Sequence, residues 1–332
     1  MKMYFSKKRI LSLLTCLFLA FSAGCAPAPS SDLTPDQLYA AGRKFLVNNG
    51  DSELAREYFL AALDKQPDHT LSHMGMASIY RGELDFESAV ASYEAAAKGR
   101  GNEQDQKDAW IALARLRASA GQMAQAERVL MDAYEQTGDP QYLEVQLEAN
   151  RLTLSGKWIK DLTPLSTDQW IHLESLSLYT PNVEDYAPLS NLTGLEFLEI
   201  VESKVSDLSF LGGMKRLEVL YLGFNEITDL TPLRGLTNLR ILNVSGNPKL
   251  SSLGGIEDLS NLEQLSIMET KVTDLTALSH FTELWSLDIS RLDIADFQPI
   301  RSCPIQRLYA FSIPEEAKMT LEEMFPAAKI LF

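Results

Sequence analysis

The sequence predicts an α+β repeat protein, in which an N-terminal array of α-helices precedes a solenoid with a parallel β-sheet. Two periodicities support this prediction. A helical pattern recurs at intervals of 34 and 37 residues within residues 36–149, and a pattern of alternating leucines recurs at 22 residues within residues 150–332. A unit of this length cannot bury its own apolar face, so such units stack on their neighbours.

The first 24 residues have the pattern of a bacterial secretion signal. The basic segment Lys7-Lys8-Arg9 precedes an apolar run over residues 10–23, which is short for a membrane span. The run ends in Ser-Ala-Gly-Cys at residues 22–25, which resembles the bacterial lipobox. The resemblance implies cleavage before Cys25 and attachment of a lipid to its thiol, and Ala26 in place of Asp implies the outer membrane. The alternatives are an ordinary signal peptide with a chance cysteine and an uncleaved anchor.

Residues 25–35 are rich in Pro, Ala and Ser and predict a short tether. Loss of the first 24 residues, which hold four basic groups and no acid, would change the net charge from −15 to −19. A chain this acidic repels polyphosphate, which argues against nucleic-acid binding. Only Cys303 would remain as a free thiol after lipidation, so we expect no intramolecular disulfide.

Small and bulky residues recur at one spacing in three helical units. In each unit a small residue is followed by a bulky residue four positions later and a small residue three positions after that: Ala55, Phe59 and Ala62; Ala89, Tyr93 and Ala96; Ala126, Leu130 and Ala133. Small residues allow antiparallel helices to approach closely, and the bulky residue fills the space beside the next hairpin. The pattern resembles the tetratricopeptide repeat, and the predicted helical domain covers residues 36–149. A generic helical bundle is the alternative. We also expect residues 140–150 to add a closing helix.

The resemblance to tetratricopeptide repeats implies a concave groove lined by the first helix of each pair. It places Lys44, Arg81 and Arg115 in that groove, where some relatives hold the carboxylate of a peptide. One hypothesis is therefore that the groove binds an acidic or C-terminal peptide. The alternative is that these cations lie on solvated helix faces.

The second half contains segments in which aliphatic residues alternate with other residues. Six segments begin at Leu173, Leu195, Leu217, Leu239, Leu262 and Leu284. The alternation predicts a short strand with inward leucines in each unit. Most units continue with Val or Ile and then Asp, whose carboxylate is expected to accept backbone N–H groups in a turn.

This 22-residue pattern resembles the leucine-rich repeat of the internalins, which implies a solenoid of stacked parallel strands. Residues 151–154 look like a partial leading repeat, a further strand is expected from Ile305, and residues 318–332 are expected to cap the core. The buried asparagine of the family is present only as Asn225 and Asn247.

Outward strand positions carry an unusual number of apolar side chains. The candidate partner-binding residues of the concave sheet are Tyr179, Phe197, Val201, Val219, Tyr221, Ile241, Tyr309 and Phe311. Strands lie about 4.8 Å apart, so the members on neighbouring strands should touch. A contiguous apolar patch indicates a binding site. The alternatives are tolerated β-propensity and packing against the chain's own helical half.

The sequence shows no pattern typical of catalysis or metal binding. His69 and His73 lack a third ligand nearby in the sequence, and zinc sites need three or four ligands. There is no Gly-rich phosphate loop or Gly-x-Ser-x-Gly motif. We therefore expect a non-enzyme without metal or cofactor. The predicted function is a membrane-anchored protein–protein interaction scaffold or adaptor of the bacterial envelope, which binds proteins or peptides. The alternative is a surface-exposed adhesion protein that recognises host or neighbour-cell protein or glycan.

Overall fold

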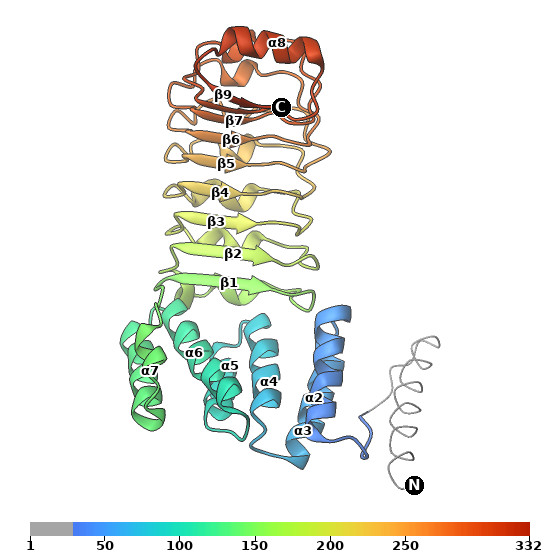
Figure 1. Ribbon diagram of the computed structural model, residues 1–332, viewed down its shortest axis with the longest axis vertical. Coiled ribbons are helices and arrows are strands. Elements are labelled where there is room, and N and C mark those ends of the chain that lie inside the picture. The colour runs from blue at the N-terminus through green and yellow to red at the C-terminus, as the bar shows by residue number, and fades with distance from the viewer. Residues whose placement is uncertain (1–28) are drawn as a thin grey trace.

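The computed structural model describes residues 29–332, and Figure 1 shows helices at one end of a column of stacked strands. The predicted signal segment and Cys25 lie outside these residues. Within residues 29–332, none of the helices combines the length and the apolarity that a membrane span requires.

The helical part contains three helix pairs among the described residues: α2 (Pro35–Lys44) and α3 (Ser52–Lys65), α4 (Thr70–Gly82) and α5 (Phe86–Ala97), and α6 (Glu103–Ser119) and α7 (Met123–Thr137). A π-helical turn at Phe45–Asn49 extends α2. Side chains of Asp51, Asp85 and Asn102 cap α3, α5 and α6 by accepting the N–H group three residues later at 2.8–3.1 Å.

Close helix packing in the first two pairs depends on glycine. The ring of Phe59 lies between Gly42 and Gly75, and a Cβ atom at either glycine would be 2.7 Å from a ring carbon. The predicted small positions Ala55 and Ala62 are fully buried beside this ring. The helical architecture is therefore as predicted, while its identity as a tetratricopeptide array stays a prediction.

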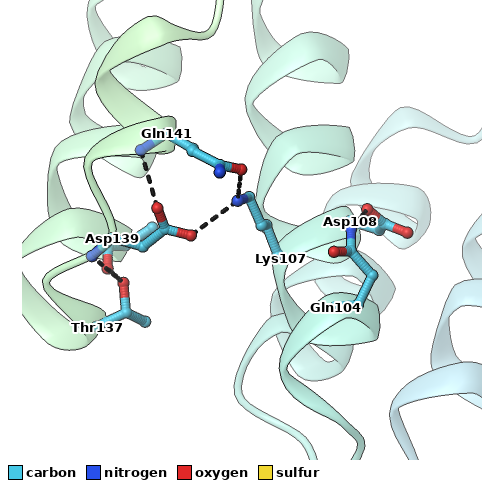
Figure 2. Close-up of polar contacts among 7 residues, drawn as sticks. Gln104, Lys107, Asp108, Thr137, Asp139 and Gln141 are labelled. Atoms are coloured by element: carbon cyan, nitrogen blue, oxygen red, sulfur yellow. Dashed lines mark hydrogen bonds and ion pairs between the residues drawn. The ribbon is translucent and has the colours of Figure 1, made fainter.

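The expected closing helix over residues 140–150 is wrong. Gly138 adopts a left-handed conformation (φ 73°) and ends α7, and only a 3₁₀ turn at Pro140–Glu144 follows. Figure 2 shows how this turn is held: the Lys107 ammonium of α6 donates to the carboxylate of Asp139 at 2.7 Å and to the amide oxygen of Gln141. The Lys107 hydrogen bond also lowers the pKa of Asp139. Side-chain hydrogen bonds thus hold the segment after α7 as a short turn, in place of the main-chain hydrogen bonds that a longer helix would form.

The second half is a parallel sheet with its strands in chain order. The described strands are β1 (Arg151–Ser155), β2 (Ser175–Tyr179), β3 (Phe197–Ile200), β4 (Val219–Tyr221), β5 (Ile241–Asn243), β6 (Gln264–Ser266), β7 (Ser286–Asp288), β8 (Arg307–Tyr309) and β9 (Lys329–Leu331). Short 3₁₀ turns form the opposite wall at Thr163–Ser166, Asp168–Trp170, Ala187–Asn191, Ser209–Gly213, Thr231–Leu233, Thr276–Leu278 and Gln298–Ile300. The inward leucines of the six predicted segments are buried, which confirms that expectation.

Side-chain oxygens hold the turns of the solenoid, as the sequence predicts. Each repeat-turn carboxylate accepts the N–H group two residues later at 2.7–2.9 Å, in Asp161, Asp185, Asp207, Asp229, Asp274 and Asp296. The buried amide of Asn225 donates to the carbonyl of Ile200 at 2.6 Å and accepts from the N–H of Ser203 at 3.0 Å. Where the asparagine is missing, the Ser203 hydroxyl accepts the N–H of Thr180 at 2.9 Å. A hydroxyl therefore continues part of the asparagine ladder.

The later helices of the array, from α4 to α7, share one hydrophobic core with the solenoid, whereas α2, α3 and one side of α4 enclose a second cluster. Helices α4 and α6 lie against β1, and a Cβ atom at Gly82 of α4 would be 2.4 Å from the indole nitrogen of Trp158. A ring nitrogen of His172 lies 3.1 Å from the carbonyl oxygen of Ser119 at the end of α6. The helices therefore close one end of the solenoid core, and α8 (Glu315–Met324) together with β9 closes the other end (Figure 1).

Candidate functional site

The sheet register brings the predicted apolar residues together. Phe197, Val219 and Ile241 are paired neighbours on β3, β4 and β5 and form one column across the sheet. The ring of Tyr221 meets the ring of Phe197 edge-to-face, with centroids 5.7 Å apart and planes at 83°. The expected side-chain contact is thus present between these two residues. We refer to Phe197, Val201, Val219, Tyr221 and Ile241 as the sheet-face patch; all five are partly exposed.

The sheet-face patch has polar borders. Ser175 on β2 and Gln264 on β6 flank its central column. Figure 1 places the helices at the β1 end of the column, so they do not cover β3–β5. The alternative that the patch packs against the chain's own helical half is therefore wrong.

The remaining predicted sheet residues lie on either side of the patch. Burial and a hydrogen bond to Glu199 raise the pKa of Tyr179, on β2, to about 12. Tyr309 and Phe311 pack together with ring centroids 6.5 Å apart at the β8 end. A shallow hollow of about 290 Å³ runs across the polar strands between, from Tyr221 to Tyr309. The eight residues therefore lie in two groups with the hollow between them: one along β2–β5 that contains aliphatic as well as aromatic side chains, and an aromatic pair at the β8 end.

Phe224 is an exposed aromatic that the sequence reasoning missed. It follows β4 by three residues, is 49% exposed, and has a left-handed backbone with φ 57°. Its ring lies over Gly246, where a Cβ atom would be 2.5 Å from the ring. A left-handed conformation costs an L-residue about 1–2 kcal/mol. The signal that could have found it is the glycine at the matching position of the next repeat, Gly246, which also has positive φ.

The structure separates the three predicted groove cations. Arg81 of α4 and Arg115 of α6 line one cleft of about 430 Å³, and Lys44 does not line it. The third arginine of this cleft is Arg151 of β1, which pairs with Glu148 at 2.7 Å. Sequence reasoning missed Arg151 because it belongs to the other half of the chain, and only the end-on packing of the helices brings it near.

The described residues contain no cluster of three or more His, Cys, Asp or Glu that could hold a metal ion. His69 contacts Ser72 and Asp36 at 2.7 and 3.0 Å, whereas His73 contacts the carbonyl of Pro67 at 2.8 Å. Cys303 is buried, and burial raises the pKa of its thiol to about 11.

Comparison with known proteins identifies the solenoid. Residues 193–235 and 215–261 match a family model described as Leucine Rich repeats (2 copies), and these residues contain β3, β4 and β5. This part of the chain is a leucine-rich repeat. Leucine-rich repeats stack into solenoids that present extended binding surfaces, so the sheet-face patch lies within a fold suited to binding other proteins. A search of curated proteins finds no match.

Several solved structures resemble the chain in part. An internalin (InlF) of Listeria monocytogenes is 31% identical, with 52% of this chain and 52% of that chain covered and a TM-score of 0.47. A second Listeria monocytogenes internalin is 27% identical, covers 45% of this chain and 65% of its own, and has a TM-score of 0.42. A leucine-rich-repeat protein of Leptospira interrogans is 20% identical with a TM-score of 0.38 and 52% of each chain covered. This chain therefore spans about half the length of the first internalin.

Proposed function

We propose that this protein is a membrane-anchored interaction protein of the bacterial envelope, which holds a protein partner on the sheet face of its leucine-rich repeats. The observation that carries the proposal is the sheet-face patch, with the Phe197–Tyr221 ring contact at its centre. The inward leucines already supply the core of the solenoid. Aromatic side chains on the outer face are therefore not needed for the fold, and exposed apolar patches of this kind are typical of protein interfaces.

The shape and borders of the patch favour a protein over a small molecule. Three neighbouring strands contribute to one apolar column, and the adjoining hollow is shallow and lined by polar residues such as Asn243 and Gln264. Protein interfaces combine a desolvated aromatic centre with a polar rim in this way. Phe224 adds a further exposed aromatic beside β4.

The proposed anchor is a lipid on Cys25, with residues 25–35 as the tether. The support for it is the basic and apolar pattern that precedes the Ser-Ala-Gly-Cys motif. Two or more acyl chains give stable anchoring, whereas one chain is marginal. Replacement of Cys25 by Ser should abolish incorporation of labelled palmitate and should release the protein from the membrane fraction. Unlabelled wild-type protein in the membrane would contradict the anchor without affecting the sheet-face proposal.

Site-specific photo-crosslinking in native membranes tests the binding surface. A photoreactive phenylalanine analogue replaces Tyr221, and a matched variant carries it at the exposed Lys215 on the turn side of the solenoid. We expect a discrete adduct from position 221 and none from position 215. Absence of an adduct at position 221, or the same adduct from both positions, would contradict binding by the sheet face.

A further inference from the structure

The polar hollow of the sheet face reaches well beyond the sheet-face patch. It has a volume of about 290 Å³, and most of the residues that line it belong to β6, β7 and β8. It shares Tyr221 and Ile241 with the patch, whose apolar column lies on β3–β5. One end of the hollow therefore borders the proposed protein interface, and the rest of it is a separate surface.

The register of the strands builds the hollow from two rows of polar side chains. The rows are Gln264, Ser286 and Arg307 in one, and Asn243, Ser266, Asp288 and Tyr309 in the other. Ser266 and Ser286 are short, and longer side chains flank each of them in its row, so the sheet face is hollowed over the two serines. Because neighbouring strands lie about 4.8 Å apart, successive members of a row can contact one ligand together.

Several polar groups of the hollow have no partner within the described part of the chain. Ser286 is only 7% exposed, and its N–H donates to the carbonyl of Glu263, but its hydroxyl forms a hydrogen bond with no described residue. The side-chain amide of Gln264 and the guanidinium of Arg307 likewise form hydrogen bonds with no described residue. The hollow thus presents a nearly buried hydroxyl between two longer polar groups, with donors and acceptors available to a ligand.

The charges of the hollow cancel and are held in place. Asp288 and Arg307 are the charged residues that line it. The Asp288 carboxylate accepts the N–H of Ser290 at 3.0 Å and the hydroxyl of Ser266 at 3.3 Å, and the Arg307 guanidinium lies 5.4 Å from the ring centroid of Trp285. The whole chain carries a net charge of −15, which repels anionic ligands. The hollow therefore suits an uncharged, polar ligand.

We infer that this hollow binds an uncharged saccharide chain. Sugar hydroxyls both donate and accept hydrogen bonds, so they match a floor that combines hydroxyl, amide, carboxylate and guanidinium groups. Tyr221 and Tyr309 stand at the two ends of the hollow, and the C–H groups of a sugar ring pack well against the electron-rich face of an aromatic ring. A protein segment fits this floor less well, because the centres of protein interfaces are apolar and aromatic.

Isothermal titration calorimetry tests the inference on the full chain, kept in a detergent without a sugar head group. The probes are cellotetraose, maltotetraose and chitotetraose, and a heparin tetrasaccharide is the anionic comparison. Ser286→Leu fills the floor of the hollow. Ser175→Leu is the matched control, because it makes the same change at the same strand position on β2, outside the hollow. Gln264→Ala with Arg307→Ala removes two unpartnered groups without filling the space.

We expect at least one uncharged tetrasaccharide to bind the wild type with a millimolar or lower dissociation constant, and the heparin tetrasaccharide to bind more weakly. Ser286→Leu and the Gln264 and Arg307 variant should each bind that probe at least about tenfold more weakly, the cost of losing about two hydrogen bonds. The Ser175→Leu control should bind like the wild type.

Three results would overturn the inference: no binding of any uncharged probe at millimolar concentration, tighter binding of the heparin tetrasaccharide, or wild-type affinity in a hollow variant. If Ser286→Leu unfolds, the Gln264 and Arg307 variant decides. Because the titration uses the purified protein without its protein partner, a negative result leaves the sheet-face proposal standing, and photo-crosslinking tests that proposal separately.

Discussion

The ring of Phe86, at the start of α5, meets the ring of Trp170 edge-to-face across the junction of the two halves, with centroids 6.2 Å apart and planes at 81°. Both side chains are buried, and both belong to the core that runs from the helices into the solenoid. The contact joins an element of the helical array to the first 3₁₀ turns of the solenoid wall. The two halves are therefore expected to unfold together.

Trp170→Ala tests this coupling. Removal of a large buried aromatic should lower the free energy of unfolding by about 3–5 kcal/mol. Because the core is shared, calorimetry should show one transition in the wild type and one shifted transition in the variant. If the wild type instead shows two transitions, and Trp170→Ala shifts the temperature of only one of them, the two halves are independent domains.

Phe224→Asn separates stability from binding. Asparagine tolerates the left-handed backbone better than phenylalanine, so the variant should be as stable as wild type or more stable by up to about 1 kcal/mol. The same change removes an exposed aromatic side chain beside the sheet-face patch. It should therefore reduce the amount of the protein partner that a pull-down recovers. Thermal unfolding and quantitative pull-down measure the two effects. If the variant unfolds at a lower temperature but the pull-down recovers as much partner as with wild type, Phe224 stabilises the fold and does not contribute to binding.

The periodicity of the sequence was sufficient to predict the strands and the turn aspartates. A strand of alternating leucines at a fixed interval has only one way to bury its apolar side, and the Asp side chain that follows needs only local N–H groups. Both features depend on residues near one another in the chain. The helical pairs were predictable for the same reason.

Features that depend on contacts between distant segments were not predictable. Arg151 joins Arg81 only because the helices pack end-on against β1. Phe224 was not predicted, because the alternation of apolar and polar residues locates the two faces of a strand and gives no information on a left-handed residue after the strand. The error in the closing helix is of another kind, because Gly138 and Pro140 are local signals that favour termination of α7. Only the pairing of Asp139 with Lys107, which holds the turn that follows, depends on a distant segment.

Cys303 should be unreactive in the folded protein. Burial raises the pKa of its thiol to about 11, so almost no thiolate exists at neutral pH, and the sulfur is screened from reagents. In a chain with Cys16→Ser and Cys25→Ser, the remaining thiol should react with a maleimide only after denaturant is added. Rapid stoichiometric labelling of the native protein would contradict the packing around Leu278, whose carbonyl oxygen lies 3.3 Å from the sulfur.

The turn aspartates should make the solenoid sensitive to acid. Hydrogen bonds from the hydroxyls of Thr163, Thr231 and Thr276 lower the pKa of Asp161, Asp229 and Asp274, respectively. A lowered folded-state pKa gives stability that is present above the unfolded value and is lost as the pH falls through the folded value. The melting temperature should therefore be flat from pH 7 to about 5 and fall below about pH 4.

Replacement of these three aspartates by asparagine tests the cause. An asparagine oxygen can still accept the turn N–H group but does not titrate in this range. The triple variant should show a weaker decline in melting temperature below about pH 4 than the wild type. An identical decline in both proteins would place the acid sensitivity in other carboxylates.

The most direct test of the sheet-face proposal combines Phe197→Ala with Tyr221→Ala. Both side chains are partly exposed and lie outside the leucine core, so the melting temperature should change little. Ser175→Ala with Gln264→Ala, at the borders of the same column, is the matched control. The measurement is the affinity for the partner that crosslinks at position 221. Loss of an aromatic interface centre costs about 2 kcal/mol or more, so affinity should fall at least roughly thirtyfold in the double aromatic variant and hardly in the control. If the double aromatic variant keeps both the affinity and the melting temperature of the wild type, the sheet-face patch is not the centre of the binding surface.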